Sequence, residues 1–155
     1  MFMFMNLNDV LTKQNVLAKI LLKDANKELS KELKVKIMRI RMTYNKIKKD
    51  FDESVKEFTE NLVTDDFRLL HDKLNRSSEE EARLQEMNDA INSEYQEFLV
   101  QKGKEEVIIS IDDNFNIDEY EEIIEVNAGN NVEINGNRIT APDFLEIFCD
   151  LFVKE

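Results

Sequence analysis

The single histidine and the single cysteine are the residues best suited to nucleophilic chemistry, because a Cys–His pair can activate a nucleophile. His71 lies among leucines and next to Asp72, whereas Cys149 lies in a strongly apolar stretch. No motif links the two residues, and a cysteine in such a stretch is typically a small core residue. We therefore predict that the protein is not an enzyme and uses no cofactor.

Four polar residues have the alternating spacing of a calcium-binding loop. They are Asp112, Asn114, Asn116 and Asp118. Such a loop also needs glycine at its sixth position and glutamate at its twelfth, where this chain has Ile117 and Ile123. The segment therefore predicts a polar turn and a helix N-cap, with no metal site.

The first 102 residues contain neither glycine nor proline, which predicts long helices joined by polar turns. A first helix is expected from residue 8 or 9 to about 23. A long spine helix follows over 29–62, and a third helix begins at Ser77 or Ser78 and ends at Gly103. Thr64 is predicted to cap a short helix between the spine and the third helix.

The spine and the third helix carry matching apolar series at helical spacing, which predicts antiparallel packing. The residues expected at this contact are Ile40, Tyr44, Ile47, Phe51, Leu84, Ile91, Tyr95 and Phe98. Val35, Met38 and Met42 lie on nearly the opposite side of the spine. Either the first helix covers these three residues, or they form an exposed Met-rich patch that binds a partner or a second copy.

The last third of the chain has a different pattern. It predicts a strand over 106–111, a helix over 116–126, a hairpin with an Asn-Gly turn, and a last helix over 141–153. We therefore expect a mainly α fold: a long helical hairpin or three-helix layer (1–102) followed by a small α+β cap (103–155).

The net charge of −12 is divided unevenly. Residues 1–49 carry 12 Lys/Arg and 4 Asp/Glu, whereas residues 50–155 carry 9 and 29. A nucleic-acid-associated protein that uses the basic spine face at 34–49 is therefore an alternative function. The third helix is strongly acidic, however, and would neutralise that face, and the net charge opposes approach to a polyanion.

A dense acidic cluster in the predicted helix over 116–126 raises the opposite possibility, that the protein mimics a nucleic acid. Its members are Asp118, Glu119, Glu121, Glu122 and Glu125. Such a cluster could occupy a basic groove on another protein, although charge runs are usually solvated helix faces.

The apolar start of the chain, Met1–Met5, has no assigned partner, is too short for a signal peptide and lacks a basic flank. No stretch is long enough to span a membrane. We expect a cytoplasmic protein that forms a homo-oligomer, most simply a two-fold dimer, through Met1–Met5 or through Val35, Met38 and Met42.

The chain also resembles a family of small bacteriophage and prophage proteins. The resemblance lies in Glu97-Phe98-Leu99, in Glu105-Glu106-Val107-Ile108 and in the ending from Ile139 to Val153. It implies a helical hairpin, a short strand and a C-terminal helix. It also implies a non-enzymatic protein, in the host cytoplasm, that binds a protein partner and either assembles a virion or blocks a host or defence system.

Overall fold

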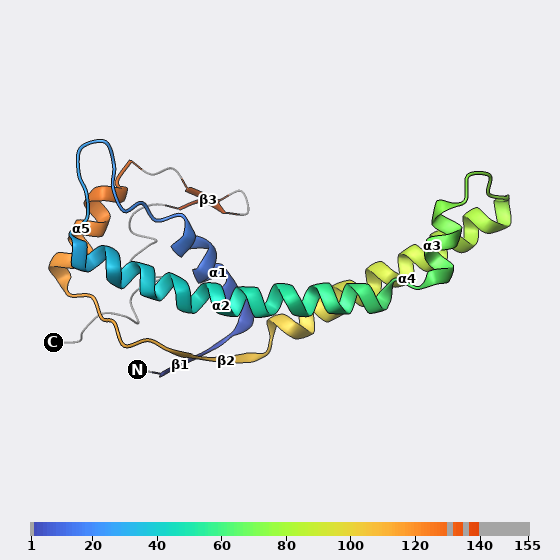
Figure 1. Ribbon diagram of the computed structural model, residues 1–155, viewed down its shortest axis with the longest axis horizontal. Coiled ribbons are helices and arrows are strands. Elements are labelled where there is room, and N and C mark those ends of the chain that lie inside the picture. Colours follow the sequence, from blue (N-terminus) through green and yellow to red (C-terminus); the bar gives the residue numbers. More distant parts are fainter. Residues whose placement is uncertain (1, 130–131, 135–136, 140–155) are drawn as a thin grey trace. The chain divides into compact units, whose positions relative to one another are not determined.

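The computed structural model describes residues 2–129, 132–134 and 137–139 (Figure 1). In chain order the elements are β1 (Phe2–Asn6), α1 (Leu7–Ala18), α2 (Lys31–Leu62), α3 (Asp65–Asp72), α4 (Ser78–Gly103), β2 (Glu106–Ser110), α5 (Ile117–Asn127), β3 (Val132–Ile134) and β4 (Asn137–Ile139). The protein is mainly α-helical with small β elements, which confirms the predicted fold class. Within the described residues, no helix is both long enough and apolar enough to cross a membrane.

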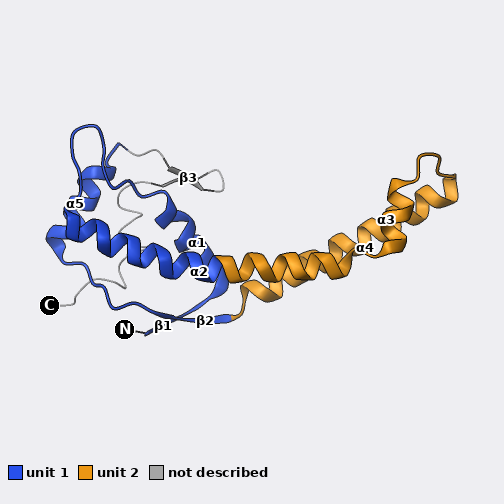
Figure 2. Cartoon of the chain, in the orientation of Figure 1, with its two compact units in different colours: residues 1–48, 106–155 blue, residues 49–105 orange. Residues whose placement is uncertain are grey.

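The chain forms two compact units (Figure 2). Unit 1 combines residues 1–48 with 106–155, and unit 2 consists of residues 49–105. This division differs from the predicted domains at 1–102 and 103–155, because the chain returns after α4 to the elements with which it began. The glycine at 103 ends a helix, but a helix end does not indicate which elements the following segment packs against.

Unit 1 contains a sheet of two antiparallel strands, β1 and β2, in which Phe4 pairs with Ile108. The apolar N-terminal segment therefore has a partner, contrary to the expectation from sequence. Met3 and Ile109 point into the core, where both are almost completely buried.

The core of unit 1 lies among the first half of α2, α1, the sheet and α5. Its buried apolar residues include Val10, Leu17, Leu33, Ile37, Ile40, Tyr44, Ile109, Phe115, Ile123 and Val126. Ile40 and Tyr44 were expected to face α4, and that part of the prediction is wrong. The sheet and α1 cover the first half of α2, so its apolar series is buried within unit 1.

Helix α1 is shorter than predicted, since it ends at Ala18 rather than near residue 23. The segment after it is held by the side chain of the buried Asn127. The Leu21 amide donates to Asn127 Oδ1 at 2.9 Å, and Asn127 Nδ2 donates to the Leu21 carbonyl oxygen at 3.2 Å. Tertiary hydrogen bonds thus replace a further helical turn. A turn follows at Asp24, whose carboxylate accepts from the amides of Asn26 and Lys27.

Unit 2 contains an antiparallel pair of helices formed by the end of α2 and by α4, with α3 between them in the chain (Figure 1). The rings of Phe58 and Phe98 stack with centroids 4.1 Å apart and planes 6° apart. The half-buried apolar positions of α4 include the four predicted ones, Leu84, Ile91, Tyr95 and Phe98. The predicted pairing is therefore confirmed for the second half of the spine only.

The predicted helix ends in unit 2 are also confirmed. Thr64 Oγ1 accepts from the Phe67 amide at the start of α3. Ser77 and Glu80 form a capping box at the start of α4, and Gly103 is its last residue. The strands β3 and β4 pair antiparallel as predicted. The predicted turn at 135–136 and the predicted last helix at 141–153, with Cys149, lie outside the described residues.

Candidate protein-binding surface on helix α2

The residues first considered for chemistry do not form a reactive centre within the described part of the chain. His71 is exposed on α3, where its Nδ1 lies 3.2 Å from Asp72 Oδ1 and its ring stacks on Phe67. Asn116 caps α5, because its side chain accepts from the Glu119 amide at 2.8 Å. The segment that resembles a calcium loop therefore ends in a helix N-cap, as expected. No group of three or more His, Cys, Asp or Glu residues suited to a metal ion occurs among the described residues.

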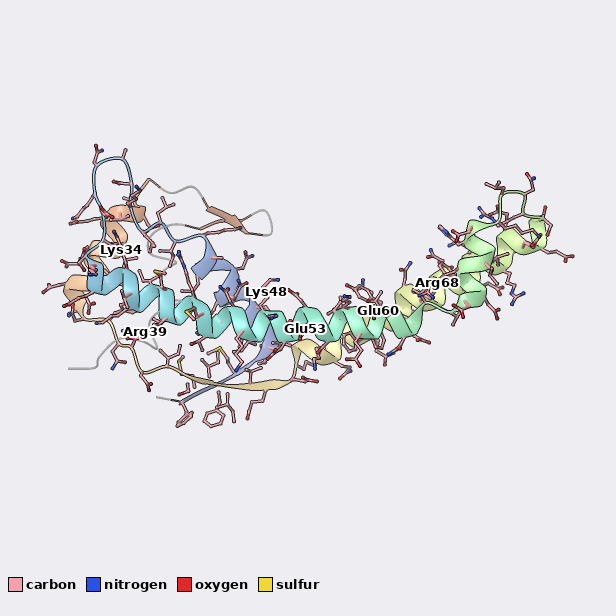
Figure 3. All side chains as sticks on the ribbon, in the orientation of Figure 1. Lys34, Arg39, Lys48, Glu53, Glu60 and Arg68 are labelled. Atoms are coloured by element: carbon pink, nitrogen blue, oxygen red, sulfur yellow. The ribbon has the colours of Figure 1, made fainter. Side chains whose placement is uncertain are left out.

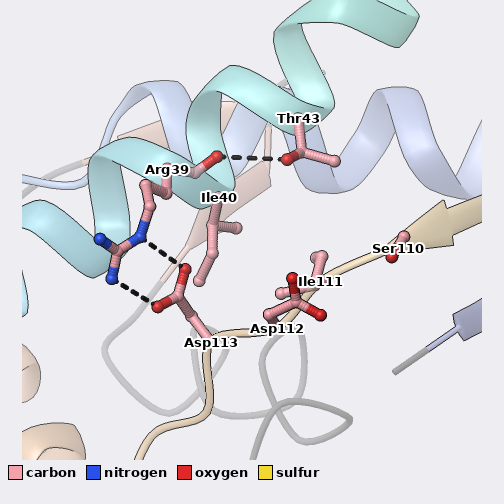
Figure 4. Close-up of a pocket in the computed structure, with 7 residues that line it drawn as sticks. All are labelled: Arg39, Ile40, Thr43, Ser110, Ile111, Asp112 and Asp113. Carbon is pink, nitrogen blue, oxygen red and sulfur yellow. Dashed lines mark hydrogen bonds and ion pairs between the residues drawn. The ribbon is translucent and has the colours of Figure 1, made fainter.

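A shallow hollow in unit 1 lies between α2 and the segment after β2 (Figure 4). Its volume is about 350 Å³, and Arg39 and Asp113 form a two-point ion pair at its rim. The distances are 3.0 Å from Nε to Oδ2 and 2.7 Å from Nη2 to Oδ1. The hydrogen bonds from Arg39 lower the pKa of Asp113. Asp113 therefore stays ionised near neutral pH, and the pair fastens residues 111–116 to α2 rather than transferring protons.

Most basic side chains on the first half of α2 are engaged within unit 1. Lys34 forms an ion pair with Glu28. Lys36 Nζ lies 2.9 Å from both carboxylate oxygens of Glu119 and donates to the Asn114 carbonyl oxygen at 3.0 Å. The anionic partners come from the segments around α2 and from α5, and not from α4 as the sequence had suggested.

Arg41 has a different role, because it donates to backbone oxygens at the end of α1. Its Nε donates to the Leu17 carbonyl at 2.8 Å, and its Nη2 donates to the Ile20 carbonyl. Burial lowers the pKa of the Arg41 guanidinium. These contacts engage backbone carbonyl groups at and just after the C-terminal end of α1, where regular helical hydrogen bonding stops. Arg41 is thus part of the structure of unit 1 and is not available to a ligand.

The acidic cluster on α5 is also largely used inside unit 1. Besides the Glu119–Lys36 pair, Glu122 Oε1 accepts from the Ser30 amide at 2.6 Å, and Glu125 forms an ion pair with Lys27. Asp118 and Glu121 are exposed. Three of the five carboxylates therefore fasten α5 to the start of α2 and the segment before it, which leaves little of the cluster to imitate a nucleic acid.

The opposite side of α2 carries an apolar row that other elements in the described part of the chain leave exposed. Val35 is 40% exposed, Met38 52% and Met42 70%. Helix α1 packs on the buried series of α2 instead, so the expectation that it covers these three residues is wrong. The row lies on the same part of α2 as Lys34 and Arg39, which Figure 3 labels.

Lysine residues lie at both ends of this row. Lys31 precedes Val35 by four residues, and Lys46 follows Met42 by four. Spacings of three and four place all five residues on one side of the helix. Both lysines are exposed, and neither forms an ion pair with another described residue. We call Lys31, Val35, Met38, Met42 and Lys46 the α2 face.

Comparison with protein families, with curated proteins and with solved structures found no match. Function is therefore inferred from the surface itself. The sequence identified the apolar row through its position opposite the main series, but it did not distinguish the two lysines from their neighbours.

Proposed function

We propose that this is a non-enzymatic protein-binding protein whose α2 face takes an acidic amphipathic helix of a partner protein. The observation that supports this proposal is the exposure of Val35, Met38 and Met42 on a helix whose other side is buried. Methionine side chains are flexible and polarisable, which suits them to binding surfaces that adapt to a ligand.

The charges at the ends of the α2 face define the chemistry of the partner. From Lys31 to Lys46 the helix rises by roughly 22 Å, at ~1.5 Å per residue. A partner helix of about four turns would match this length. Its apolar side chains would recur at helical spacing and contact the methionines, and glutamate or aspartate near each end would pair with the lysines. The pairs would be solvent-exposed, so they would fix register and specificity more than affinity.

Two other ligands fit this surface less well. A second copy packed antiparallel on the same face would place Lys31 of one copy near Lys46 of the other, which is repulsive. A nucleic acid, the alternative function, would need a field of free cations. Four of the seven basic residues between 34 and 49 are instead bound to carboxylates or carbonyl groups of the protein.

The biological setting implied by the sequence resemblance belongs to the same proposal. A bacteriophage protein that acts in the host cytoplasm would use the α2 face to hold either a virion component or a host protein. Virion assembly and the blocking of a host protein would both require an acidic amphipathic helix as the ligand. The first experiment therefore tests binding of such a helix and not the identity of the partner.

Binding of fluorescein-labelled helical peptides, followed by fluorescence anisotropy, tests the proposal. The first probe is a 16-residue amphipathic peptide with leucines on one side and glutamates at both ends. The second has the same apolar side with lysines at the ends. We expect the acidic peptide to bind and the basic one to bind at least ~10-fold more weakly, because like charges would face each other.

Two variants locate the site. Met38→Glu should weaken binding of the acidic peptide by at least ~10-fold, because a carboxylate would be buried there without a partner. Leu69→Glu, on exposed α3 in unit 2, is the matched control and should bind normally. Equal affinity of wild type and Met38→Glu for the acidic peptide would contradict the proposal. Salt-sensitive binding of duplex DNA that Lys46→Glu abolishes would favour the nucleic-acid alternative.

A further inference from the structure

The sheet formed by β1 and β2 carries apolar residues on both of its faces. Residues that pair in an antiparallel sheet point to the same side, so Phe2, Phe4 and Ile108 share one face. The inner face carries Met3 and Ile109, which lie in the core. Strands with one face in water usually alternate apolar and polar residues, whereas continuous apolar runs occur where both faces are covered.

No other described residue covers the outer face. Phe2 is 70% exposed, Phe4 64% and Ile108 58%. An aromatic side chain offers roughly 200 Å² for burial, so the two phenylalanines expose roughly 270 Å² and Ile108 brings the patch to nearly 400 Å². A patch of this size on one small protein commonly marks an interaction site.

The distribution of charge indicates what covers this face. The six residues that point outward are Phe2, Phe4, Asn6, Glu106, Ile108 and Ser110, of which only Glu106 is charged. Two copies of a chain with a net charge of −12 repel each other over most of their surfaces. They can approach closely only where both are uncharged, and the aromatic end of this face meets that condition.

We propose that two copies of the chain associate by packing the outer faces of their β1–β2 sheets against each other. Two sheets pack face to face about 10 Å apart, with their side chains interdigitating. A two-fold axis through the contact would bring Phe2, Phe4 and Ile108 of one copy onto the same residues of the other. The pair of two-stranded sheets then forms a small sandwich, and the outer face becomes part of a shared core.

The contact surface is small, so the dimer forms in a concentration-dependent way. An apolar patch of nearly 400 Å² on each copy is about half of the ~800 Å² per partner that a standard stable interface buries. This dimer does not depend on the proposed function, because the α2 face and the outer face of the sheet share no residue.

Light scattering coupled to gel filtration, over a range of protein concentrations, tests the proposal on the full chain. Wild type should move from the mass of one chain, 18.3 kDa, towards twice that mass as concentration rises. Phe4→Lys should remain at the mass of one chain at each concentration. Met38→Glu, on the α2 face, is the matched control and should dimerise like wild type, whether or not it binds a peptide.

A mixing experiment distinguishes loss of the dimer contact from misfolding as the reason why a variant is monomeric. Phe4→Lys and Phe4→Glu should each be monomeric alone, with circular dichroism spectra like that of wild type. An equimolar mixture should recover dimer, because opposite charges then face each other across the two-fold axis. A wild-type chain that stays monomeric at all concentrations would overturn the proposal. So would a dimer that persists in Phe4→Lys, or a mixture of folded variants that stays monomeric.

Discussion

The sequence assigns the apolar residues of α2 and α4 to one interface, but the structure places Ile40 and Ile91 in different units. Replacing each by alanine should therefore reduce stability by different amounts. Ile40 is 1% exposed in the core of unit 1, whereas Ile91 is half-buried on α4 in unit 2. Isoleucine to alanine removes three carbon groups in both cases. The matched pair Ile40→Ala and Ile91→Ala therefore compares full with partial burial at constant chemistry.

The expected loss follows from burial and cavity volume. At Ile40 the three carbon groups are worth about 2.4 kcal/mol at ~0.8 kcal/mol each. An unfilled cavity of roughly 50 Å³ adds about 1.2 kcal/mol, so the total loss is near 3.5 kcal/mol. At Ile91 about half of the transfer term is lost, and water fills the space, so the loss is about 1–1.5 kcal/mol.

Urea denaturation followed by circular dichroism at 222 nm measures both losses, with wild type and the two variants compared at the same protein concentration. Separate transitions for the two units would assign each loss to its own unit, since Ile40 belongs to unit 1 and Ile91 to unit 2. Equal losses in the two variants, or a larger loss at Ile91, would refute the assignment of Ile40 to a separate, better-packed core.

Two further predictions concern polar contacts. Arg41→Met should destabilise unit 1 by about 1.5–3 kcal/mol, the range for hydrogen bonds to a charged group, and should speed hydrogen exchange of the amides just after α1. The hydrogen bond from Lys73 and those with Ser77 lower the pKa of Glu80 to about 2 from the usual 4.5. The ionised Glu80 side chain therefore stabilises the folded state fully above pH 4.5, and this stabilisation is lost as the pH falls towards 2. In acid titrations followed by hydrogen exchange at the start of α4, Glu80→Gln should abolish this pH dependence, whereas Glu79→Gln, at an exposed position of the same turn, should retain it.

The helices and their ends were predictable because they depend on local sequence. The caps at Thr64 and Ser77 and the end of α4 at Gly103 each follow from a side chain or backbone preference within one turn. The shorter α1 was not predictable in the same way. Its end depends on Asn127 and Arg41, which are far away in the sequence, and their hydrogen bonds outweigh a good local helix pattern.

The partner of each apolar face was harder to infer than the face itself. The spacing of apolar residues in α2 correctly indicated two apolar sides. Such spacing does not identify which other helix or strand packs on each side. The pairing of β1 with β2 joins residues about 100 positions apart. It moves α1 onto the main series and leaves Val35, Met38 and Met42 exposed. The same pairing covers one face of the N-terminal strand and leaves Phe2 and Phe4 on the other.

The charges in the sequence do not show which charged side chains are available to a ligand, because many of them form ion pairs within the protein. The basic half of α2 and the acidic helix α5 look like two complementary binding sites in the sequence. In the structure one ion pair, Lys36 with Glu119, joins the two helices, and carboxylates outside α5 pair with Lys34 and Arg39. Two surfaces remain after these contacts are taken into account. One is the α2 face, which has a lysine at each end of its apolar row, and the other is the outer face of the β1–β2 sheet, which carries one charged residue. In the proposals made above, the lysine-flanked row takes an acidic helix and repels its own copy, whereas the nearly uncharged face takes a second copy. Because the two surfaces differ in charge in this way, a dimer formed through the sheet would leave both α2 faces open to their ligands.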